Sequence, residues 1–257
     1  MTVISGIAKT TILASTLAIC APAVAQVDLS NPASPFANIP KNKNWIGEVN
    51  RTERGHILGN PDADAKMIEF VSYTCSVCLI FAQEGEPAID LTLLMPGDMS
   101  VEVRPMIRNY LDLTVSMLVA CGDPKTFKVR HRDFMWSQPT WLGKANAAPA
   151  SQRAIWERAD KAARVNLAAA LDLDDKLIAR GASAGEVNKC LTDDTLAQSL
   201  IDNSNADRTE FGVRSTPSFA LDGKLLPDVH QWATLYPILS DRFAPKATAN
   251  ALGSGGE

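Results

Sequence analysis

Apolar residues gather in a few short runs that predict β-strands. Residues 67–73 read MIEFVSY, an almost continuous apolar, β-branched and aromatic run that is typical of a strand covered on both faces. Residues 100–107, SVEVRPMI, predict a second strand, although Pro105 fits a hydrogen-bonded ladder imperfectly. Residues 45–49 are a weaker candidate for a strand. These runs predict that the sheet begins in the first part of the chain.

Strand-forming residues return only near the C-terminus. Residues 218–221 and 224–226 flank Asp222 and Gly223, a pair that strongly favours a hairpin turn. A helix over residues 231–243 is expected to close the fold. The sheet is therefore predicted to come from two separate parts of the sequence.

The segment between these two parts has a helical texture. A helix from Ser151 to Leu171 would place Trp156 and several small or apolar residues on one stripe at spacings of three and four. The run DDTLAQSLIDN begins another helix with acids in its first turn, and Gly212 is a suitable end for it.

The order strand, helix, strand, helical block, hairpin and helix predicts an α/β fold with a helical insertion. The predicted α/β domain comprises residues 45–108 and 212–243, and the insertion comprises residues 109–211. Residues 26–44, rich in Pro, Asn, Ser and Ala, are predicted to be a linker, and residues 244–257 a mobile tail.

Residues 1–25 are typical of an export signal. Lys9 is their one charged side chain, the following residues are small and apolar, and AVA fits a cleavage site after Ala25. We therefore expect cleavage at that position and export to the periplasm. The alternative is a lipoprotein signal with a lipid on Cys20, which the bulky Ile19 disfavours.

The net charge of the chain argues against some classes of partner. The chain has 257 residues and a net charge of −4, and loss of residues 1–25 removes one lysine and no acid, so the mature charge becomes −5. Neither value provides the basic patch that nucleic acid or an anionic membrane usually requires. We expect no nucleic-acid partner.

Two cysteines, Cys75 and Cys78, directly follow the first predicted strand with two residues between them. With Cys20 removed, four cysteines remain, an even number that favours disulfides over zinc in an oxidising compartment. The alternatives are a structural staple, which would stabilise little across so small a loop, and half a zinc site. Because no second C-x-x-C motif or paired histidines appear, we expect no metal and no cofactor.

The same pair suits thiol–disulfide exchange. A helix is predicted to begin at Cys75, with Thr74 as its cap and Pro87 as a kink or end. Unpaired N–H groups at a helix start stabilise a thiolate. Cys75 would then form a mixed disulfide with a substrate, and Cys78 would resolve it.

Glu69 stands inside the apolar run, six residues before Cys75. A buried carboxylate is costly, so Glu69 either faces water on an edge strand or is a functional acid beneath the cysteines. In the second interpretation it exchanges a proton with Cys78, and burial raises its pKa.

Pro217 follows Thr216 at the start of the first C-terminal strand. The simpler interpretation is a trans proline that starts the hairpin. The sharper one is a cis bond, which would leave the Thr216 backbone facing the cysteines and free to pair with an extended substrate.

The motif EFVSYTCSVC, followed far downstream by GVRSTPSF, resembles the DsbA-like branch of the thioredoxin-fold superfamily. That family combines a C-x-x-C at a helix start, an acid six residues earlier, a cis proline opposite, and a helical domain inserted between two halves of the fold. The resemblance covers about residues 45–243 and implies a thioredoxin-like fold with an inserted α-helical domain. It implies these roles: Cys75 as nucleophile, Cys78 as resolving cysteine, Glu69 as buried acid, and Thr216 and Pro217 as the substrate-facing loop.

Cys121 and Cys190 flank most of the helical insertion. They are either two free buried thiols or a structural disulfide, and export favours the disulfide. The resemblance agrees in kind, since some DsbA-like proteins carry a second disulfide in the helical domain.

The predicted function is an exported thiol–disulfide oxidoreductase that exchanges disulfides with thiols of secreted or periplasmic proteins. Its substrates would be unfolded or reduced exported proteins, and the resemblance implies a membrane-bound, quinone-coupled redox partner. An isomerase or reductase of the same fold is one alternative. The linker is too short for the dimerisation domain of such isomerases, so a monomer is expected. A chaperone-like binding module with permanently joined cysteines and a metal carrier are the alternatives from other classes.

Val77 departs from the strongly oxidising members of the family, which carry histidine at that position. Valine offers no charge or donor to a Cys75 thiolate, so we expect a weaker oxidant than a His-bearing relative. Val77→His is expected to lower the pKa of Cys75 and make the couple more oxidising, as measured by thiolate absorbance and by equilibration with glutathione. The interpretation is wrong if neither quantity changes.

Overall fold

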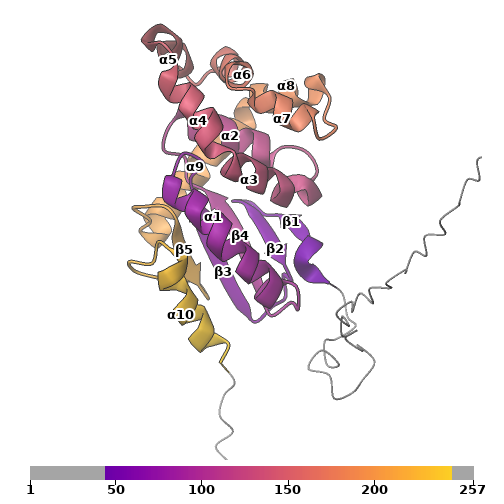
Figure 1. Ribbon diagram of the computed structural model, residues 1–257, viewed down its shortest axis with the longest axis vertical. Coiled ribbons are helices and arrows are strands. Elements are labelled where there is room, and N and C mark those ends of the chain that lie inside the picture. Colours follow the sequence, from indigo (N-terminus) through magenta and orange to yellow (C-terminus); the bar gives the residue numbers. More distant parts are fainter. Residues whose placement is uncertain (1–43, 245–257) are drawn as a thin grey trace, which may run out of the picture. The chain divides into compact units, whose positions relative to one another are not determined.

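The computed structural model describes residues 44–244, which belong to one compact unit (Figure 1). The predicted signal segment, residues 26–43 of the predicted linker and the tail after residue 244 lie outside the described residues. Within residues 44–244, no helix is long and apolar enough to cross a membrane.

One six-stranded mixed sheet forms the α/β part, with the strand order β1-β2-β4-β3-β5-β6. The strands are β1 (Val49–Arg51), β2 (His56–Gly59), β3 (Ala65–Val71), β4 (Met99–Pro105), β5 (Ser218–Leu221) and β6 (Lys224–Leu225). β3 and β4 run parallel, and the other neighbours are antiparallel. β3 is therefore an interior strand, bordered by β4 and β5.

The two long apolar runs predicted as strands correspond to β3 and β4, and each strand begins and ends one or two residues earlier than expected. Pro105 is the last residue of β4, where a proline is tolerated. The predicted strand at residues 45–49 is largely wrong. Trp45–Gly47 forms the 3-10 helix η1, whose N-terminus is capped by the side chain of Asn44, and β1 begins only at Val49.

The C-terminal hairpin is confirmed. β5 and β6 pair antiparallel, and Asp222 and Gly223 between them have φ values of 49° and 79°. Asn, Asp and Gly tolerate this left-handed region, which the tight hairpin turn requires.

Helices α1 (Ser76–Ile89) and α10 (Trp232–Arg242) lie together on one face of the sheet (Figure 1). Phe81 of α1 packs against Phe219 of β5 with ring centroids 4.7 Å apart. Pro87 does not end α1, because the helix continues to Ile89 and passes into the π-helical segment η2 (Asp90–Leu94).

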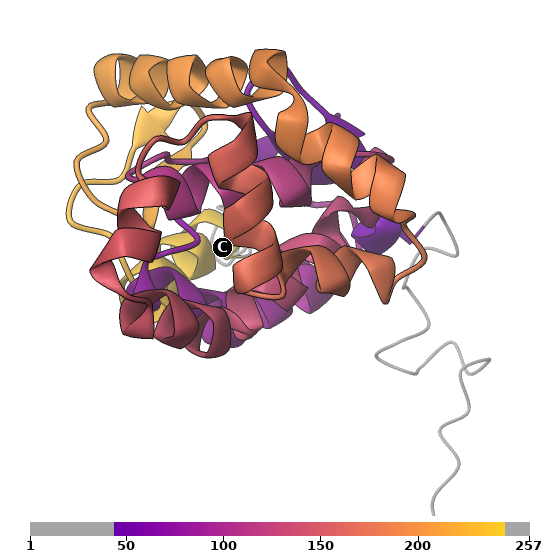
Figure 2. The ribbon, with the colours of Figure 1, turned by 90° about the horizontal axis from the view of Figure 1, so that it is seen from above.

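Between β4 and β5 the chain is helical, and Figure 2 shows these helices from above. The helices are α2 (Tyr110–Ala120), η3 (Pro124–Thr126), α3 (Phe127–Trp136), α4 (Gln138–Ala147), α5 (Ala150–Trp156), α6 (Lys161–Ala170), α7 (Leu173–Ile178), α8 (Ala184–Thr192) and α9 (Asp194–Phe211). Helix α2 is the centre of this block: every residue from Leu111 to Val119 is buried, and α3, α6, α7, α8 and α9 all contact it.

The predicted single helix from Ser151 to Leu171 is wrong. A turn separates α5 from α6, and within it Ala159 adopts a φ of 54°. The Asp160 carboxylate accepts a hydrogen bond from the N–H of Ala163 and so starts α6 afresh. The end of α9 at Gly212 is confirmed, with a φ of 71°.

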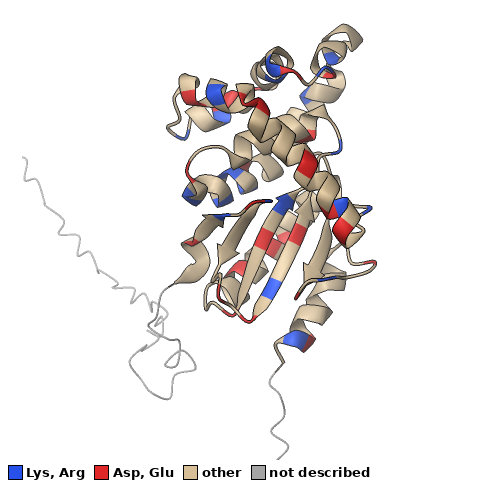
Figure 3. Ribbon diagram, turned by 180° about the vertical axis from the view of Figure 1, so that it is seen from behind, with Lys and Arg blue, Asp and Glu red and all other residues tan. Residues whose placement is uncertain are grey.

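A buried carboxylate ties the block to the sheet. Asp207 of α9 accepts hydrogen bonds from Arg54 at 2.9 Å and from Arg104 of β4 at 2.8 Å. Arg104 also pairs with Glu102 on the same strand at 2.7 Å. Acidic and basic residues are interspersed on the strands and helices seen in Figure 3.

This arrangement confirms the predicted fold class, an α/β sheet domain with an α-helical insertion. The division into domains at residues 109 and 211 stays a prediction.

Cys121, at the end of α2, is joined by a disulfide to Cys190 of α8, with Cα atoms 5.9 Å apart and a sequence separation of 69. Replacement of both residues by serine is expected to lower the free energy of unfolding by up to about 4 kcal/mol, because a long loop is no longer closed in the unfolded chain. Urea unfolding of the oxidised proteins measures the difference. Serine at both Cys75 and Cys78 is the matched control and should cost less, and equal losses in the two variants would contradict the explanation.

Candidate active site

Cys75 is the residue at which the chain enters α1. Its backbone is extended, with φ −96° and ψ 118°, and its side chain accepts no capping hydrogen bond. In the thiol form its Sγ donates to the carbonyl oxygen of Thr216 at 3.1 Å. The start of α1 therefore meets the loop before β5, which lies 141 residues further along the chain.

The predicted cap of α1 is wrong. The helix begins at Ser76, and Cys75 itself occupies the N-cap position without satisfying an N–H group. The Thr74 hydroxyl instead donates to Asp112 at 3.0 Å. The helix start beside the sulfur therefore keeps its open N–H groups.

The surroundings lower the pKa of Cys75 from 9.0 to about 5. The main cause is a hydrogen bond with the Cys78 thiol, which stabilises the thiolate, and burial opposes it. The Thr216 side chain and the N–H groups of Val77 and Cys78 add to the lowering. The Thr216 hydroxyl is buried without a hydrogen-bond partner among the described residues, so it is free to donate to the thiolate.

Cys78 has the opposite electrostatic character. It is fully buried, and this burial raises its pKa well above the ordinary 9.0, helped by the hydrogen bond and the charge of Cys75. The two thiols of one helical turn are thus split into an ionised outer group and a protonated inner group.

Glu69 lies on the interior strand β3, opposite Val103 on one side and Phe219 on the other. It is 2% exposed, and its Oε1 has no hydrogen-bond partner among the described residues. The interpretation as a water-facing residue on an edge strand is therefore wrong. Burial, followed by the nearby charge of Glu86, raises the pKa of Glu69 well above 4.5. Its charge in turn contributes to the raised pKa of Cys78.

A small cavity adjoins this acid. It has a volume of about 20 Å³ and is lined by Glu69, Glu86, Lys128 and His131 among others, which is room for a single water molecule. One ring nitrogen of His131 lies 2.9 Å from Glu86, and the other lies 2.9 Å from the hydroxyl of Tyr73. Glu86 and His131 carry no local motif, so sequence reasoning did not find them.

Asp112, near the start of α2, organises the loop that precedes Cys75. One carboxylate oxygen accepts from the Ser72 hydroxyl at 2.8 Å and from the Thr74 N–H at 3.0 Å. The other accepts from the Thr74 hydroxyl at 3.0 Å and from the Arg108 N–H at 3.2 Å. Asn109 caps α2 by accepting from the N–H of Asp112, a pattern that marks the helix start but not this long-range contact.

Gln138, the first residue of α4, holds the same loop from a second helix. Its side-chain amide donates to the carbonyl of Tyr73 at 2.7 Å and to that of Cys75 at 3.0 Å. Sequence reasoning missed this residue too. The backbone on either side of Thr74 is thus held by two helices of the insertion.

The Thr216–Pro217 peptide bond is cis. The carbonyl of Pro217 lies 2.7 Å from Nδ1 of His230, which precedes α10. The hydrogen bond from Cys75 thus brings the Thr216 carbonyl to the sulfur, and the cis peptide bond to Pro217 follows directly in the chain. Val77 is partly buried and packs against the main core.

The site does not resemble a metal centre. Within residues 44–244, no three His, Cys, Asp or Glu side chains gather so that they could hold a metal ion. The chemistry available to the site is that of one acidic thiol, one buried thiol and one buried carboxyl group.

Sequence comparison places this geometry in a known context. The thioredoxin family profile matches residues 51–241. A protein of Rickettsia bellii named "Putative protein-disulfide oxidoreductase" is 25% identical over 172 residues, which are 66% of this chain and 58% of the relative. A Rickettsia conorii protein of the same description is 24% identical over 197 residues, 76% of this chain and 63% of the relative. The matches thus span less than two thirds of these relatives.

Two solved structures are also similar. The protein-disulfide isomerase of Novosphingobium aromaticivorans is 34% identical with a TM-score of 0.72, and the match covers 75% of this chain and 99% of that protein. Wolbachia pipientis alpha-DsbA1 is 18% identical with a TM-score of 0.55, covering 72% of this chain and 88% of that one. The second likeness concerns the fold alone.

Glu69→Gln is expected to become increasingly stabilising as pH rises. In the unfolded chain Glu69 loses its proton near 4.5, whereas the raised pKa keeps the proton bound in the folded state. Above pH 4.5 the unfolded state therefore binds fewer protons, and the wild type loses stability with rising pH until Glu69 ionises in the folded protein. Glutamine removes this loss.

Urea unfolding of wild type and Glu69→Gln between pH 4 and pH 8 measures the difference. Glu84→Gln, an exposed position on α1, is the matched control and should give a difference independent of pH. A pH-independent difference for Glu69→Gln would show that Glu69 has no raised pKa.

Proposed function

The chain belongs to the thioredoxin family, and from that premise we propose that it is a DsbA-like thiol–disulfide oxidoreductase acting through Cys75 and Cys78. The single observation that carries the proposal is the opposite displacement of two thiol pKa values within one helical turn, at about 5 for Cys75 and well above 9.0 for Cys78. One ionised thiol and one protonated thiol suit an attacking and a resolving role, respectively.

In the oxidising direction, the enzyme begins with a Cys75–Cys78 disulfide. A substrate thiolate attacks Cys75 Sγ, a mixed disulfide forms, and Cys78 leaves as a thiolate. A second thiolate of the substrate then attacks the substrate sulfur that is bonded to Cys75. This forms the substrate disulfide and releases Cys75 as a thiolate. The substrate loses two electrons and the enzyme gains them. The low pKa of Cys75 supports this direction because it makes Cys75 a good leaving group.

Glu69 would serve as the proton reservoir for the buried thiol. Its protonated carboxyl group could give a proton to the departing Cys78 thiolate, and its carboxylate could take that proton back when Cys78 attacks. The cavity shared with Glu86 and His131 would hold a water molecule for exchange with the rest of the network. The raised pKa values of Glu69 and Cys78 support this assignment.

The substrates we propose are unfolded or reduced exported proteins that pair with the backbone near Thr216. The contact between Cys75 and the Thr216 carbonyl supports this position, since an extended chain bound there would lie next to the reactive sulfur. The names of the similar proteins, which refer to protein disulfides, support the substrate class. Export to the periplasm, a quinone-coupled membrane partner and a monomeric state belong to the same proposal.

An isomerase or reductase is the second candidate, for a specific reason. The Val77 side chain packs against the core and provides no charged or hydrogen-bonding group to Cys75. The 34% identical relative is described as a protein-disulfide isomerase. A redox potential for the Cys75–Cys78 couple, measured against glutathione, distinguishes a strong oxidant from this alternative.

Cys75→Ala is expected to abolish insulin reduction and the oxidative refolding of a reduced protein, because the attacking sulfur is gone. Cys78→Ala should still attack but not resolve, so mixed disulfides with substrate should accumulate on non-reducing gels. In Cys78→Ala, however, loss of the hydrogen bond from Cys78 should raise the Cys75 pKa above the wild-type value of about 5. Thiolate absorbance against pH measures both values.

The same variants test the chaperone-like alternative. A binding module would keep its peptide affinity and show no loss of function in Cys75→Ala. Unchanged activity of that variant would contradict an enzyme, as would a Cys75 that titrates in the wild type near 9.0.

A further inference from the structure

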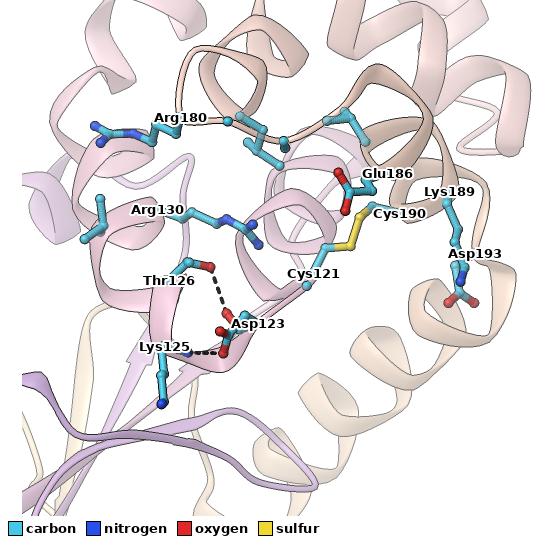
Figure 4. A pocket seen from close by; sticks show the side chains of 16 residues that line it. Cys121, Asp123, Lys125, Thr126, Arg130, Arg180, Glu186, Lys189, Cys190 and Asp193 are labelled. Atoms are coloured by element: carbon cyan, nitrogen blue, oxygen red, sulfur yellow. Dashed lines mark hydrogen bonds between the residues drawn. A yellow bond between two sulfur atoms is a disulfide. The ribbon is translucent and has the colours of Figure 1, made fainter.

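A second concave site lies beside the Cys121–Cys190 disulfide (Figure 4). It has a volume of about 680 Å³ and lies between the segment after α2, helix α3 and helix α8. The Cys75 loop is held at the other end of α2, whose 11 residues span about 16 Å. This pocket is therefore separate from the candidate active site.

Arg130 of α3 is the unusual residue in this pocket. Its Nη1 is buried and has no hydrogen-bond partner among the described residues. The guanidinium lies close over Gly122, since a Cβ built on that glycine would be 3.2 Å from both Nη1 and Nη2. Figure 4 shows the side chain extending from α3 into the pocket, toward the disulfide. Arg130 as a whole is only half-buried, but a buried N–H group without an acceptor is costly, so it calls for an explanation.

The acids that line the pocket are already engaged at helix starts. Asp123 accepts from the N–H of Lys125 at 3.0 Å, and Asp193 accepts from that of Leu196 at 3.0 Å. Glu186 accepts from the N–H and the hydroxyl of Ser183, each at 2.8 Å, in a capping box. None of these carboxylates forms an ion pair with Arg130 within residues 44–244.

The basic side chains that line the pocket outnumber the acidic ones, with Lys125, Arg130, Arg180 and Lys189 against Asp123, Glu186 and Asp193. The ammonium groups of Lys125 and Lys189 form no ion pair or hydrogen bond within the described part of the chain, whereas Arg180 pairs with Asp133 at 3.1 Å. Just behind the pocket, Arg51 donates to the carbonyl of Gly122 at 2.8 Å. Burial and then the charge of Arg51 lower the pKa of Arg130, and the charges of Asp123 and Glu186 offset only part of this lowering. A bound anion would relieve this repulsion.

The remaining wall is apolar. Val129, Leu177, Ala182 and Val187 line it, and Val129 is exposed. An inorganic anion would satisfy Arg130 but leave the half-exposed Val129 in water, whereas Leu177 and Val187 are already buried. A ligand with one carboxylate and an apolar body would satisfy both parts of the pocket.

We propose that this pocket binds an apolar carboxylate, with the carboxylate on Arg130, supported by Lys125 and Lys189, and the apolar body against Val129, Leu177 and Val187. Arg130 offers the planar fork that pairs with a carboxylate through two hydrogen bonds. The ligand is either a free carboxylic acid or the C-terminal carboxylate of a peptide, since both present the same group.

Binding is tested on the oxidised full chain by NMR titration and by thermal unfolding at low ionic strength. The probes are hexanoate and N-acetyl-leucyl-leucine, with hexanamide, the amide of the dipeptide and inorganic phosphate as comparisons. Both acids are expected to bind saturably and the amides at least tenfold more weakly. Tighter binding of the dipeptide acid points to a polypeptide source, and tighter binding of hexanoate to a small-molecule source.

Arg130→Met is the decisive variant, and Arg132→Met is its control. Arg132 lies on the same helix, but its guanidinium pairs with Asp90 at 3.2 Å and does not line the pocket. Arg130→Met should weaken hexanoate binding at least tenfold and should be no less stable than wild type without ligand, because a buried N–H group that lacks an acceptor is removed. Arg132→Met should bind as wild type does.

Three results would overturn the proposal. One is the absence of saturable shifts with either acid in the wild type. Another is phosphate binding as tightly as hexanoate, which would show that the apolar wall plays no part. The third is equal weakening in Arg130→Met and Arg132→Met, which would show only a general response to charge.

Discussion

The start of α1 governs this structure, because it holds a negative sulfur against open backbone N–H groups in a largely buried place. A thiolate at Cys75 is tolerable there only if donors surround it, and Cys78, the Thr216 hydroxyl and the first N–H groups of α1 supply them. The arrangement separates the two thiols by charge, although they belong to one turn of helix. Any side chain that satisfied those N–H groups in place of the sulfur would weaken that separation.

The helical insertion helps to keep the helix start open. Asp112 draws the Thr74 hydroxyl and N–H toward α2, and Gln138 holds the carbonyls of Tyr73 and Cys75. Asp112 accepts four hydrogen bonds, a number that makes a fully buried carboxylate tolerable. Sheet and insertion are therefore two parts of one site, since β3 provides Glu69, the loop before β5 provides Thr216, and the insertion shapes the loop that carries Cys75.

Local signals allowed much of this to be predicted. Signals of only a few residues were enough to predict the Asp222-Gly223 turn, the helix end at Gly212 and the C-x-x-C pair. The fold class followed from the order of elements and from a family resemblance. Glu69 was recognisable because a charged residue inside an apolar run is an anomaly.

The failures came from contacts between distant residues. Thr74 has the composition of a helix cap, but Asp112, 38 positions away, takes its hydroxyl. The apolar stripe through Trp156 looked like one helix because periodicity does not register a new cap at Asp160. Gln138 and His131 have no distinguishing neighbours in the sequence, and only the packing of α3 and α4 against the sheet domain gives them their roles.

The grip of Asp112 and Gln138 on the loop limits how this fold can be recombined. A chimera that kept CSVC and the sheet but took its helices from a relative would need equivalent acceptor and donor groups at those two places. Without Asp112, the Ser72 hydroxyl and the Thr74 N–H would lose their shared acceptor, and α2 would no longer fix the loop that leads into Cys75. The helical segment therefore cannot be exchanged freely between relatives, because its residues help to set the acidity of a thiol in another part of the chain.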